Sequence, residues 1–382
     1  MPYVTLLMIT WLSAIISACV NMVITYKYLL NTEHGFEYGI LIACQIISVA
    51  CFSPVLERYI SRFARPAKFF LIFGLVSALL NILVIQGQEF LTFSIYIFFT
   101  TLTQTLNAAL FYKLLPRLFK EDKVKLFNIW SEQALSTSFF LSALLVPFAF
   151  FFTQTAELFF ILSAFINFSC GSIFYIIFRK VTVETILHKS INSWQNYINI
   201  LTEKKLRHFF FTSNIYLFAF SATAFALAMI AKEVGGGNIY LYSYPIIAMF
   251  AGRIIALLVL KRLLSWDISF LFIVGCVISA IFMAPLGGIN NIYLLCCLEF
   301  FLGIGLAIAK YSEKSYYQLE HLDTDLAKVS ILRSASALIN KSLSIPFVLA
   351  IAYYDKLIFI SITLAFCYLI SAIIMVKYKL RY

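Results

Sequence analysis

Long apolar segments recur along this 382-residue chain, about six in each half, and each is long enough to cross a bilayer. A helix of about 20 apolar residues spans the ~30 Å hydrocarbon core of a membrane. Backbone amides cannot stay unpaired in lipid, so only helices or a closed β-barrel can cross it. Barrel strands are about 10 residues long and alternate in polarity. These runs are twice as long and do not alternate, which predicts an all-α integral membrane protein.

The composition agrees with a chain that is mostly inside lipid. It is 62% hydrophobic and only 12% charged, whereas a soluble domain carries roughly 25% charged residues. The apolar runs predict twelve transmembrane helices, at residues 4–26, 36–56, 68–87, 90–112, 127–153, 157–178, 208–231, 239–260, 268–287, 290–310, 328–352 and 356–377. No cleavable leader is expected, because the first run is long, starts almost at Met1 and lacks a basic leader.

The net charge of +11 is explained by membrane topology and not by a nucleic-acid partner. Most of the 29 Lys and Arg residues fall in alternate connections, near residues 58–68, 113–125, 179–207, 261–262, 310–333 and 377–381. Basic residues concentrate in cytoplasmic loops of membrane proteins. The pattern therefore predicts a multi-pass protein of the inner (plasma) membrane with both termini in the cytoplasm.

A polar stretch at residues 180–207 divides the chain into two predicted six-helix bundles, 1–179 and 208–382. The halves align without gaps at an offset of 205 residues. Phe111-Tyr112-Lys113-Leu114 aligns with Tyr316-Tyr317-Gln318-Leu319, and Lys123-Val124-Lys125-Leu126 aligns with Lys328-Val329-Ser330-Ile331. Parallel repeats of six helices are a carrier architecture in which substrate is held between the halves. Such a carrier needs no partner chain, so we expect a functional monomer.

Two loops resemble a known family. The loop after the second predicted helix reads Ser53-Pro54-Val55-Leu56-Glu57-Arg58-Tyr59-Ile60-Ser61-Arg62 and resembles the charged loop of the major facilitator superfamily. The stretch Leu115-Pro116-Arg117-Leu118, followed by an acidic-basic turn and Asn128, is similar to that of the drug and siderophore exporter branch. The resemblance implies two pseudo-symmetric bundles around a substrate cavity, and it assigns Glu57, Arg58 and Arg62 to a cytoplasmic gate.

Three ionisable residues fall near the centres of predicted helices in the second half: Arg253, Glu299 and Lys341. A charge at the centre of a membrane helix costs at least ~2.5–3.5 kcal/mol, so each needs a reason to be there. The family resemblance implies that their helices line the cavity. We expect Glu299 to carry the coupled proton, although a structural ion pair between helices 239–260 and 290–310 is the alternative. Arg253 and Lys341 are expected to bind substrate, Arg253 through its bidentate guanidinium.

The first half offers neutral polar side chains in the helices that the resemblance places at the cavity. Asn21, Gln45, Gln104 and Asn107 suit hydrogen bonding to a polar or zwitterionic ligand. The alternative is that they join neighbouring helices to each other. Tyr216, in the predicted helix 208–231, is a further candidate for the substrate wall.

These features favour a secondary active transporter that exports a small or medium amphipathic compound, such as a drug, siderophore or peptide antibiotic, by proton antiport. The alternative is a symporter or uniporter that imports a sugar, peptide or organic acid. An enzyme is disfavoured, because a membrane transferase needs a clustered Asp, His or Asp-Asp pair at a membrane face, and His321 with Asp323 and Asp325 is only the nearest candidate. No nucleotide motif, cofactor site or metal site is expected, since the histidines lie in loops or at helix ends and no CxxC pair occurs.

Overall fold

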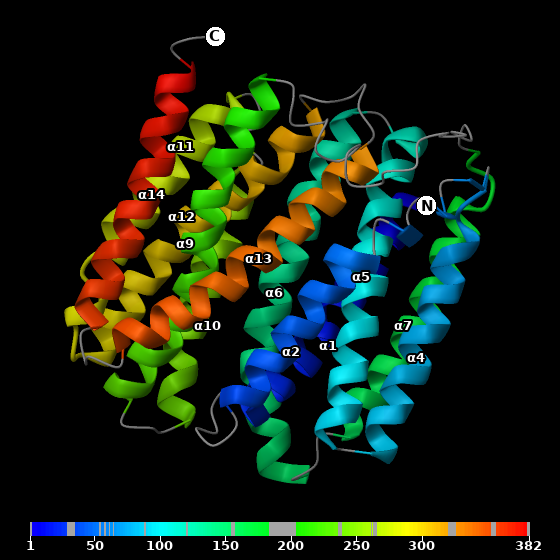
Figure 1. Cartoon of the computed structure of the whole chain (residues 1–382), viewed down its shortest axis with the longest axis horizontal. Coiled ribbons are helices and arrows are strands. Elements are labelled where there is room, and N and C mark those ends of the chain that lie inside the picture. Colours follow the sequence, from blue (N-terminus) through cyan, green and yellow to red (C-terminus); the bar gives the residue numbers. More distant parts are fainter. Residues whose placement is uncertain are drawn as a thin grey trace. The chain divides into compact units, whose positions relative to one another are not determined.

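The computed structural model describes residues 2–28, 35–52, 55–56, 59–60, 62–63, 65–87, 89–119, 121–153, 157–182, 204–235, 239–260, 262, 266–319, 326–352 and 357–379. Within these residues the chain is helical (Figure 1). The elements are α1 (Pro2–Tyr28), α2 (Gly35–Ile47), a π turn η2 (Ser48–Phe52), α4 (Lys68–Gln86), α5 (Phe90–Leu118), α6 (Glu121–Thr153), α7 (Glu157–Phe178), α9 (Lys204–Val234), α10 (Ile239–Leu260), α11 (Ile268–Met283), a 3₁₀ turn η5 (Leu286–Gly288), α12 (Ile292–Leu319), α13 (Leu326–Ala352) and α14 (Leu357–Lys379).

The all-α fold and the twelve predicted helices are confirmed within the described residues. Several helices run further than the apolar pattern predicts. The largest extension is in α12, which continues to Leu319 although its apolar run ends near residue 310. Hydropathy detects only the part of a helix that suits lipid, whereas the backbone hydrogen bonds continue through polar residues. The residues by which α12 exceeds its apolar run include Glu313, Lys314 and Tyr317.

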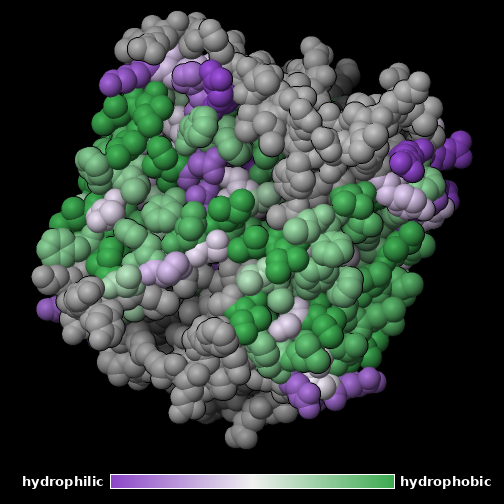
Figure 2. Space-filling view, viewed as in Figure 1, coloured by the Kyte–Doolittle hydropathy of each residue, from purple (hydrophilic) through white to green (hydrophobic). Residues whose placement is uncertain are grey.

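Seven of the described helices are long and apolar enough to cross a membrane by length and composition: α1, α4, α7, α9, α11, α12 and α14. The surface supports the same conclusion. Leu71, Leu75 and Leu79 of α4 are exposed, and hydrophobic side chains cover much of the described surface in Figure 2, with hydrophilic ones near the helix ends. An exposed apolar face of this extent is suited to lipid.

The chain divides into two compact units, and each draws on both halves of the sequence. Unit 1 comprises residues 1–127, 148–200 and 321–338, and unit 2 comprises residues 128–147, 201–320 and 339–382. The central part of α6 therefore belongs to unit 2, and the first part of α13 belongs to unit 1. The division into bundles 1–179 and 208–382 stays a prediction.

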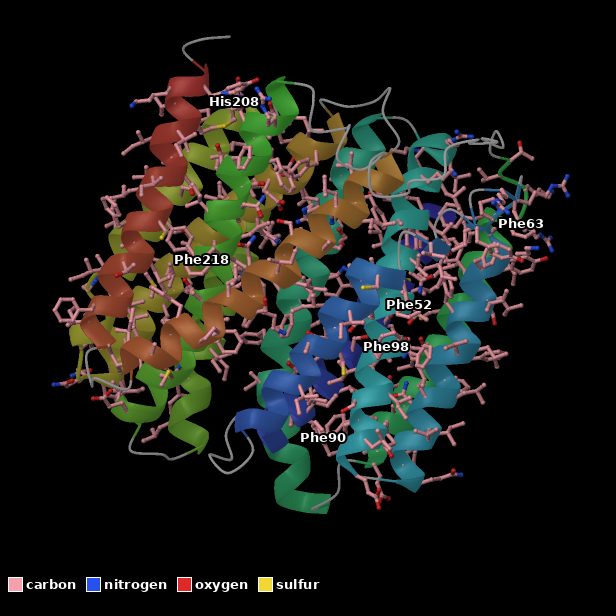
Figure 3. The ribbon with its side chains drawn as sticks, viewed as in Figure 1. Phe52, Phe63, Phe90, Phe98, His208 and Phe218 are labelled. Atoms are coloured by element: carbon pink, nitrogen blue, oxygen red, sulfur yellow. The ribbon has the colours of Figure 1, made fainter. Side chains whose placement is uncertain are left out.

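Unit 1 is held together by aromatic packing. Phe70, Phe174 and Phe178 are buried from α4 and α7, and Phe111 of α5 meets the Phe174 ring edge-on with centroids 4.8 Å apart. In the π turn, Phe52 packs edge-on against Phe98 of α5 with centroids 5.3 Å apart (Figure 3). Edge-to-face pairs add about 0.5–1.5 kcal/mol each beyond the area they bury.

The six helices of the first half are matched by six in the second. Corresponding helices begin at residues 2 and 204, 35 and 239, 68 and 268, 90 and 292, 121 and 326, and 157 and 357. These spacings stay close to the sequence offset of 205. The repeat seen in the sequence is therefore also a repeat of helix order.

Glycine permits the closest helix crossing in unit 2, between α10 and α12. A Cβ on Gly252 would collide with the carbonyl of Phe300, and one on Gly303 would collide with the carbonyl of Met249. The two backbones are thus in direct contact at reciprocal positions. Small residues serve this purpose in membrane proteins, where close van der Waals packing holds helices together.

We predict that Gly303→Ala destabilises the protein, because its methyl group must displace the α10 backbone. Overpacking costs about 1–3 kcal/mol, so for a chain of 382 residues the apparent melting temperature in detergent should fall by roughly 1–4 °C. Gly288→Ala is the matched control, since a Cβ there meets only the flexible end of Ile358, at 3.3 Å. Equal melting temperatures for the two variants would contradict the close crossing.

Candidate functional site

One face of α12 carries several buried or mostly buried ionisable side chains of unit 2. Glu299, Leu306, Lys310, Glu313 and Tyr317 are spaced by three, four or seven residues, so they form one stripe along the helix. Both carboxylates are completely buried. Burying a charge is costly unless it is paired, so the partners of this stripe are informative.

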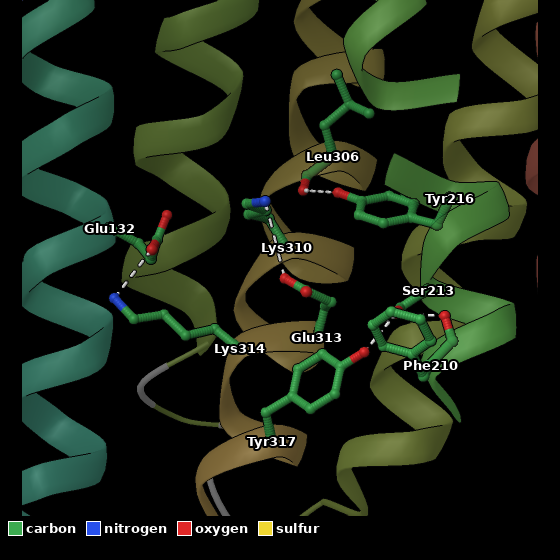
Figure 4. Close-up of polar contacts among 9 residues, drawn as sticks. All are labelled: Glu132, Phe210, Ser213, Tyr216, Leu306, Lys310, Glu313, Lys314 and Tyr317. Carbon is green, nitrogen blue, oxygen red and sulfur yellow. Dashed lines mark hydrogen bonds and ion pairs between the residues drawn. The ribbon is translucent and has the colours of Figure 1, made fainter. Parts of the chain in front are cut away.

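Two ion pairs involve neighbouring residues of α12, one within the stripe and one beside it (Figure 4). Lys310 Nζ lies 3.7 Å from Glu313 Oε2, one turn along the same helix. Lys314 Nζ lies 3.0 Å from Glu132 Oε1 of α6 and donates a second hydrogen bond to Ser131 Oγ at 2.9 Å. The Lys314 and Glu132 side chains are only 13% and 12% exposed, so this pair is mostly shielded from solvent.

Arg253 of α10 joins the same cluster. It is 6% exposed, and its guanidinium carbon lies 5.5 Å from the ring centroid of Phe220 and 5.1 Å from that of Phe250. Its Nε is buried and has no hydrogen-bond partner. Arg253 thus has aromatic contacts and an unused donor.

Lys310 shares an aromatic ring with Arg253. Its ammonium lies 5.0 Å from the centroid of Phe220, the ring that Arg253 also contacts. The two positive centres are therefore no more than 10.5 Å apart. With Lys314 they make three cations against two carboxylates, Glu132 and Glu313, so the cluster carries one more positive charge than negative.

Hydroxyl groups line α9 and α14 beside the cluster. Ser213 Oγ and Tyr317 OH are 2.6 Å apart, and Thr223 Oγ1 and Tyr368 OH are 2.9 Å apart. Tyr216 is completely buried and donates a hydrogen bond to the Leu306 carbonyl at 3.3 Å. These bonds satisfy hydroxyls that burial would otherwise penalise.

Glu299 stands apart from the cluster. Neither of its carboxylate oxygens has a hydrogen-bond partner, and it is completely buried. The alternative ion pair between the helices of Arg253 and Glu299 is not formed, because Arg253 contacts Phe220 and Phe250 instead. A carboxyl group in this position can take up a proton without breaking any contact.

Lys341, the remaining candidate of the second half, is half-buried on α13, and its backbone carbonyl accepts a hydrogen bond from Ser344 Oγ at 2.8 Å. The neighbouring Asn340 is buried and donates to Asn214 Oδ1 of α9 at 2.8 Å. This bond joins α13 to α9 within unit 2.

The candidates of the first half are dispersed. Asn21 and Gln104 are exposed, and Gln45 is half-buried. Asn107 of α5 has a buried Oδ1 with no hydrogen-bond partner, so of the four it is the strongest candidate for a hydrogen bond to substrate.

Of the three residues predicted for the cytoplasmic gate, only Arg62 is among the described residues, and Glu57 and Arg58 lie outside them. His321, Asp323 and Asp325, the grouping considered for an enzyme, also lie outside the described residues. Arg62 is exposed, and its backbone amide donates to the Tyr59 carbonyl at 3.3 Å. No group of three or more His, Cys, Asp or Glu in the described part of the chain is arranged to hold a metal ion.

Sequence reasoning missed Lys310, Glu313 and Lys314 as site residues. Hydropathy ended the helix near residue 310, so both lysines were counted as loop charges. In the structure they lie inside α12 and are 17% and 13% exposed. A usable signal was present, because the spacing from Glu299 through Lys310 and Glu313 to Tyr317 continues one helical face.

The chain is similar to known transporters over nearly its whole length. The family model of the Major Facilitator Superfamily matches residues 6–319. The human organic anion transporter MFSD10 (TETRAN) has 10% identity and a TM-score of 0.76, with 98% of this chain and 100% of that chain covered. A bacterial homologue of the iron transporter ferroportin, in an outward-facing state, has 14% identity and a TM-score of 0.73, with 99% of each chain covered. The E. coli fucose:proton symporter FucP has 12% identity and a TM-score of 0.65, with 98% of each chain covered. No curated protein matches in sequence.

The two buried acids of α12 should respond differently to neutral replacement. We predict that Glu313→Gln lowers the apparent melting temperature in detergent more than Glu299→Gln does. Glu313→Gln leaves Lys310 without its carboxylate, and breaking a buried ion pair costs about 3–5 kcal/mol. Glu299→Gln removes no ion pair. Equal losses in the two variants would contradict this distinction.

Proposed function

The chain belongs to the major facilitator superfamily of secondary transporters, and on that premise we propose that it exports an amphipathic compound bearing an anionic group in exchange for protons. A drug, siderophore or peptide antibiotic is the substrate class we favour. The family consists of transporters and not of enzymes. The fold likeness to solved transporters fixes neither substrate nor direction, so the proposal depends on the charges.

The observation that carries this proposal is the pair of cations on one aromatic ring. Arg253 and Lys310 both contact Phe220, at 5.5 and 5.0 Å from its centroid. The two cations are thus at most 10.5 Å apart, and like charges repel each other more strongly in a shielded place than in water. A bound anion would offset the repulsion between Arg253 and Lys310, because its negative charge attracts both cations.

The net charge of the cluster also favours an anionic ligand. Its three cations (Arg253, Lys310 and Lys314) exceed its two carboxylates (Glu132 and Glu313) by one positive charge, which a single anionic group would balance. The guanidinium of Arg253 offers the planar donors that suit a carboxylate or phosphate, and its Nε is unused. Lys341 on α13 is our further candidate for the same ligand.

Aromatic side chains nearby supply the apolar part of the site. Phe250, which Arg253 contacts, stacks on Phe139 of α6 with ring centroids 5.1 Å apart and an angle of 13° between the planes. Binding sites for small molecules are mostly apolar with a few placed polar groups. An amphipathic anion meets both requirements, whereas a purely cationic drug would be repelled by Arg253 and Lys310.

We propose Glu299 as the group that carries the coupled proton. It is buried on the same face of α12 as Lys310 and Glu313, and its oxygens have no partner. A carboxylate is costly in such surroundings, so taking up or losing a proton changes its energy strongly. Asn21, Gln45, Gln104 and Asn107 stay candidates for polar contacts from the first half, and Glu57, Arg58 and Arg62 for the gate.

We predict that Arg253→Met abolishes most transport of an anionic substrate, whereas Arg253→Lys retains part of it. A hydrogen bond to a charged group contributes about 1.5–3 kcal/mol, so the apparent affinity should fall about 10- to 100-fold in Arg253→Met. Arg253→Lys keeps the charge but loses the bidentate geometry. Transport would be measured with labelled compounds in proteoliposomes.

Neutral analogues of the same compounds are the control for this experiment. They should be transported weakly by the wild type and should not discriminate between the variants. An unchanged apparent affinity for the anion in Arg253→Met would overturn the anion site.

Proton coupling is tested in inverted membrane vesicles energised to be acid inside. We predict that an exported substrate collapses the gradient in the wild type but not in Glu299→Gln, since a glutamine cannot carry a proton. Siderophores, peptide antibiotics, macrolides and sugars would be added in turn. Ser279→Ala on α11, which removes a hydroxyl bonded only to its own helix at Gly275, is the control and should behave as wild type.

Two other results would redirect the assignment. If sugars, peptides or organic acids raise proton uptake into right-side-out vesicles instead, the chain is an importing symporter. If labelled substrate equilibrates with no proton movement in either variant, the chain is a uniporter and Glu299 has no coupling role.

A further inference from the structure

We propose that Gln133 of α6 determines specificity by accepting a hydrogen bond from an N–H or O–H group that the substrate carries beside its anionic group. The inference rests on the proposed function, because it takes the anionic group to bind at Arg253. It narrows the substrate class from amphipathic anions in general to anions with a neighbouring donor, such as N-acyl amino acids and hydroxy acids.

The amide of Gln133 is buried, and its acceptor is unused. The residue is 6% exposed, and its Oε1 is buried with no hydrogen-bond partner among the described residues. Such an atom is rare, because burial removes it from water and gives nothing in return. The preceding residue differs, since Glu132 Oε1 accepts a hydrogen bond from Lys314 Nζ at 3.0 Å. The Gln133 oxygen is therefore available to a ligand.

Arg253 of α10 offers the complementary group. It is also 6% exposed, and its Nε is a buried donor with no hydrogen-bond partner in the described part of the chain. Unit 2 thus contains an unused donor on α10 and an unused acceptor on α6, and the two do not bond to each other. A single ligand that satisfies both must present an acceptor to Arg253 and a donor to Gln133. An anion with a neighbouring N–H or O–H group has this pattern.

Two contacts between α6 and α10 fix how these helices lie against each other within unit 2. Phe139 of α6 stacks on Phe250 of α10 with ring centroids 5.1 Å apart. Ten residues earlier on α6, Ile129 lies in one buried apolar cluster with Leu257 of α10. The lower number on one helix is therefore paired with the higher number on the other, so the two helices run in opposite directions.

Both unused groups lie between these two contacts. Gln133 is one turn after Ile129, and Arg253 is one turn before Leu257. Residues four apart share a helix face, so Gln133 and Arg253 lie on the faces that α6 and α10 turn towards the same cluster. The guanidinium carbon of Arg253 lies 5.1 Å from the centroid of Phe250, the ring on which α6 stacks. One ligand can therefore reach both groups.

Helix packing alone does not explain a glutamine at this position. Buried amides in membrane proteins commonly join neighbouring helices, as Asn340 of α13 does by donating to Asn214 Oδ1 of α9 at 2.8 Å. The oxygen of Gln133 makes no such bond. At the offset of 205 residues the other repeat has Leu338, a side chain of similar size that avoids the cost of burying an amide.

The test compares two labelled compounds in proteoliposomes, N-benzoylglycine and N-benzoylsarcosine. Both are carboxylates with an aromatic ring, which suits the rings of Phe139, Phe220 and Phe250 around Arg253. The second compound has a methyl group in place of the amide hydrogen, so only the first can donate to Gln133. Initial rates of transport give the KM of each compound.

We predict that the wild type has a KM about 3- to 10-fold lower for N-benzoylglycine than for N-benzoylsarcosine, the effect of one hydrogen bond. In Gln133→Leu the two KM values should become equal, because leucine has a similar size but accepts no hydrogen bond. Gln133→Glu keeps an acceptor, so the preference should remain even if repulsion raises both KM values. Ser142→Ala removes a buried hydroxyl bonded to the Phe139 carbonyl of its own helix, and this control should keep the wild-type preference.

A second measurement needs no ligand. An amide oxygen that is buried without a partner destabilises the folded chain, so Gln133→Leu should raise the apparent melting temperature in detergent by roughly 1–4 °C. The same replacement at Asn340 should lower it, because Asn340→Leu breaks the bond to Asn214. A lower melting temperature in Gln133→Leu would show that this amide holds helices together and would overturn the inference.

The inference is also overturned if the wild type has equal KM values for the two compounds. It is overturned as well if the preference persists unchanged in Gln133→Leu, since the size of the methyl group would then explain it. Arg253→Met separates these failures from a failure of the proposed function. If this variant raises the KM of both compounds, the anion site stands and only the role of Gln133 is lost. If it leaves both KM values unchanged, or if the wild type transports neither compound, the anion site and the role of Gln133 are both overturned.

Discussion

The absence of water inside a bilayer is the constraint on which the rest of this structure depends. Backbone groups in hydrocarbon must be satisfied within their own segment, and this requirement forces the helices. The same absence of water makes each buried side-chain charge expensive. Unit 2 nevertheless buries Glu132, Arg253, Lys310, Glu313 and Lys314 together. Their cost is reduced by the ion pairs Lys310–Glu313 and Lys314–Glu132 and by the ring of Phe220, which Arg253 and Lys310 both approach.

Close helix packing allows this cluster to form. Gly252 and Gly303 let α10 and α12 touch along their backbones. The next residue along α10 is Arg253, which a helical step of about 100° turns away from the contact. Its guanidinium is then free to meet Phe220 of α9 and Phe250 of its own helix. Glu299 directly precedes Phe300 at the same crossing and is left without a partner.

The sequence was sufficient to predict the helices, but it identified only some of the ionisable side chains that are buried among them. Apolar runs located all twelve helices, because lipid imposes a strong requirement on composition. Arg253 and Glu299 were recognised since a charge within an apolar run is conspicuous. Lys310, Glu313 and Lys314 were not, because they follow the apolar run and resemble ordinary loop charges. Whether Arg253 meets Glu299 depends on helix rotation and on the rotamer of a long side chain, and neither is set by the residues nearby in sequence.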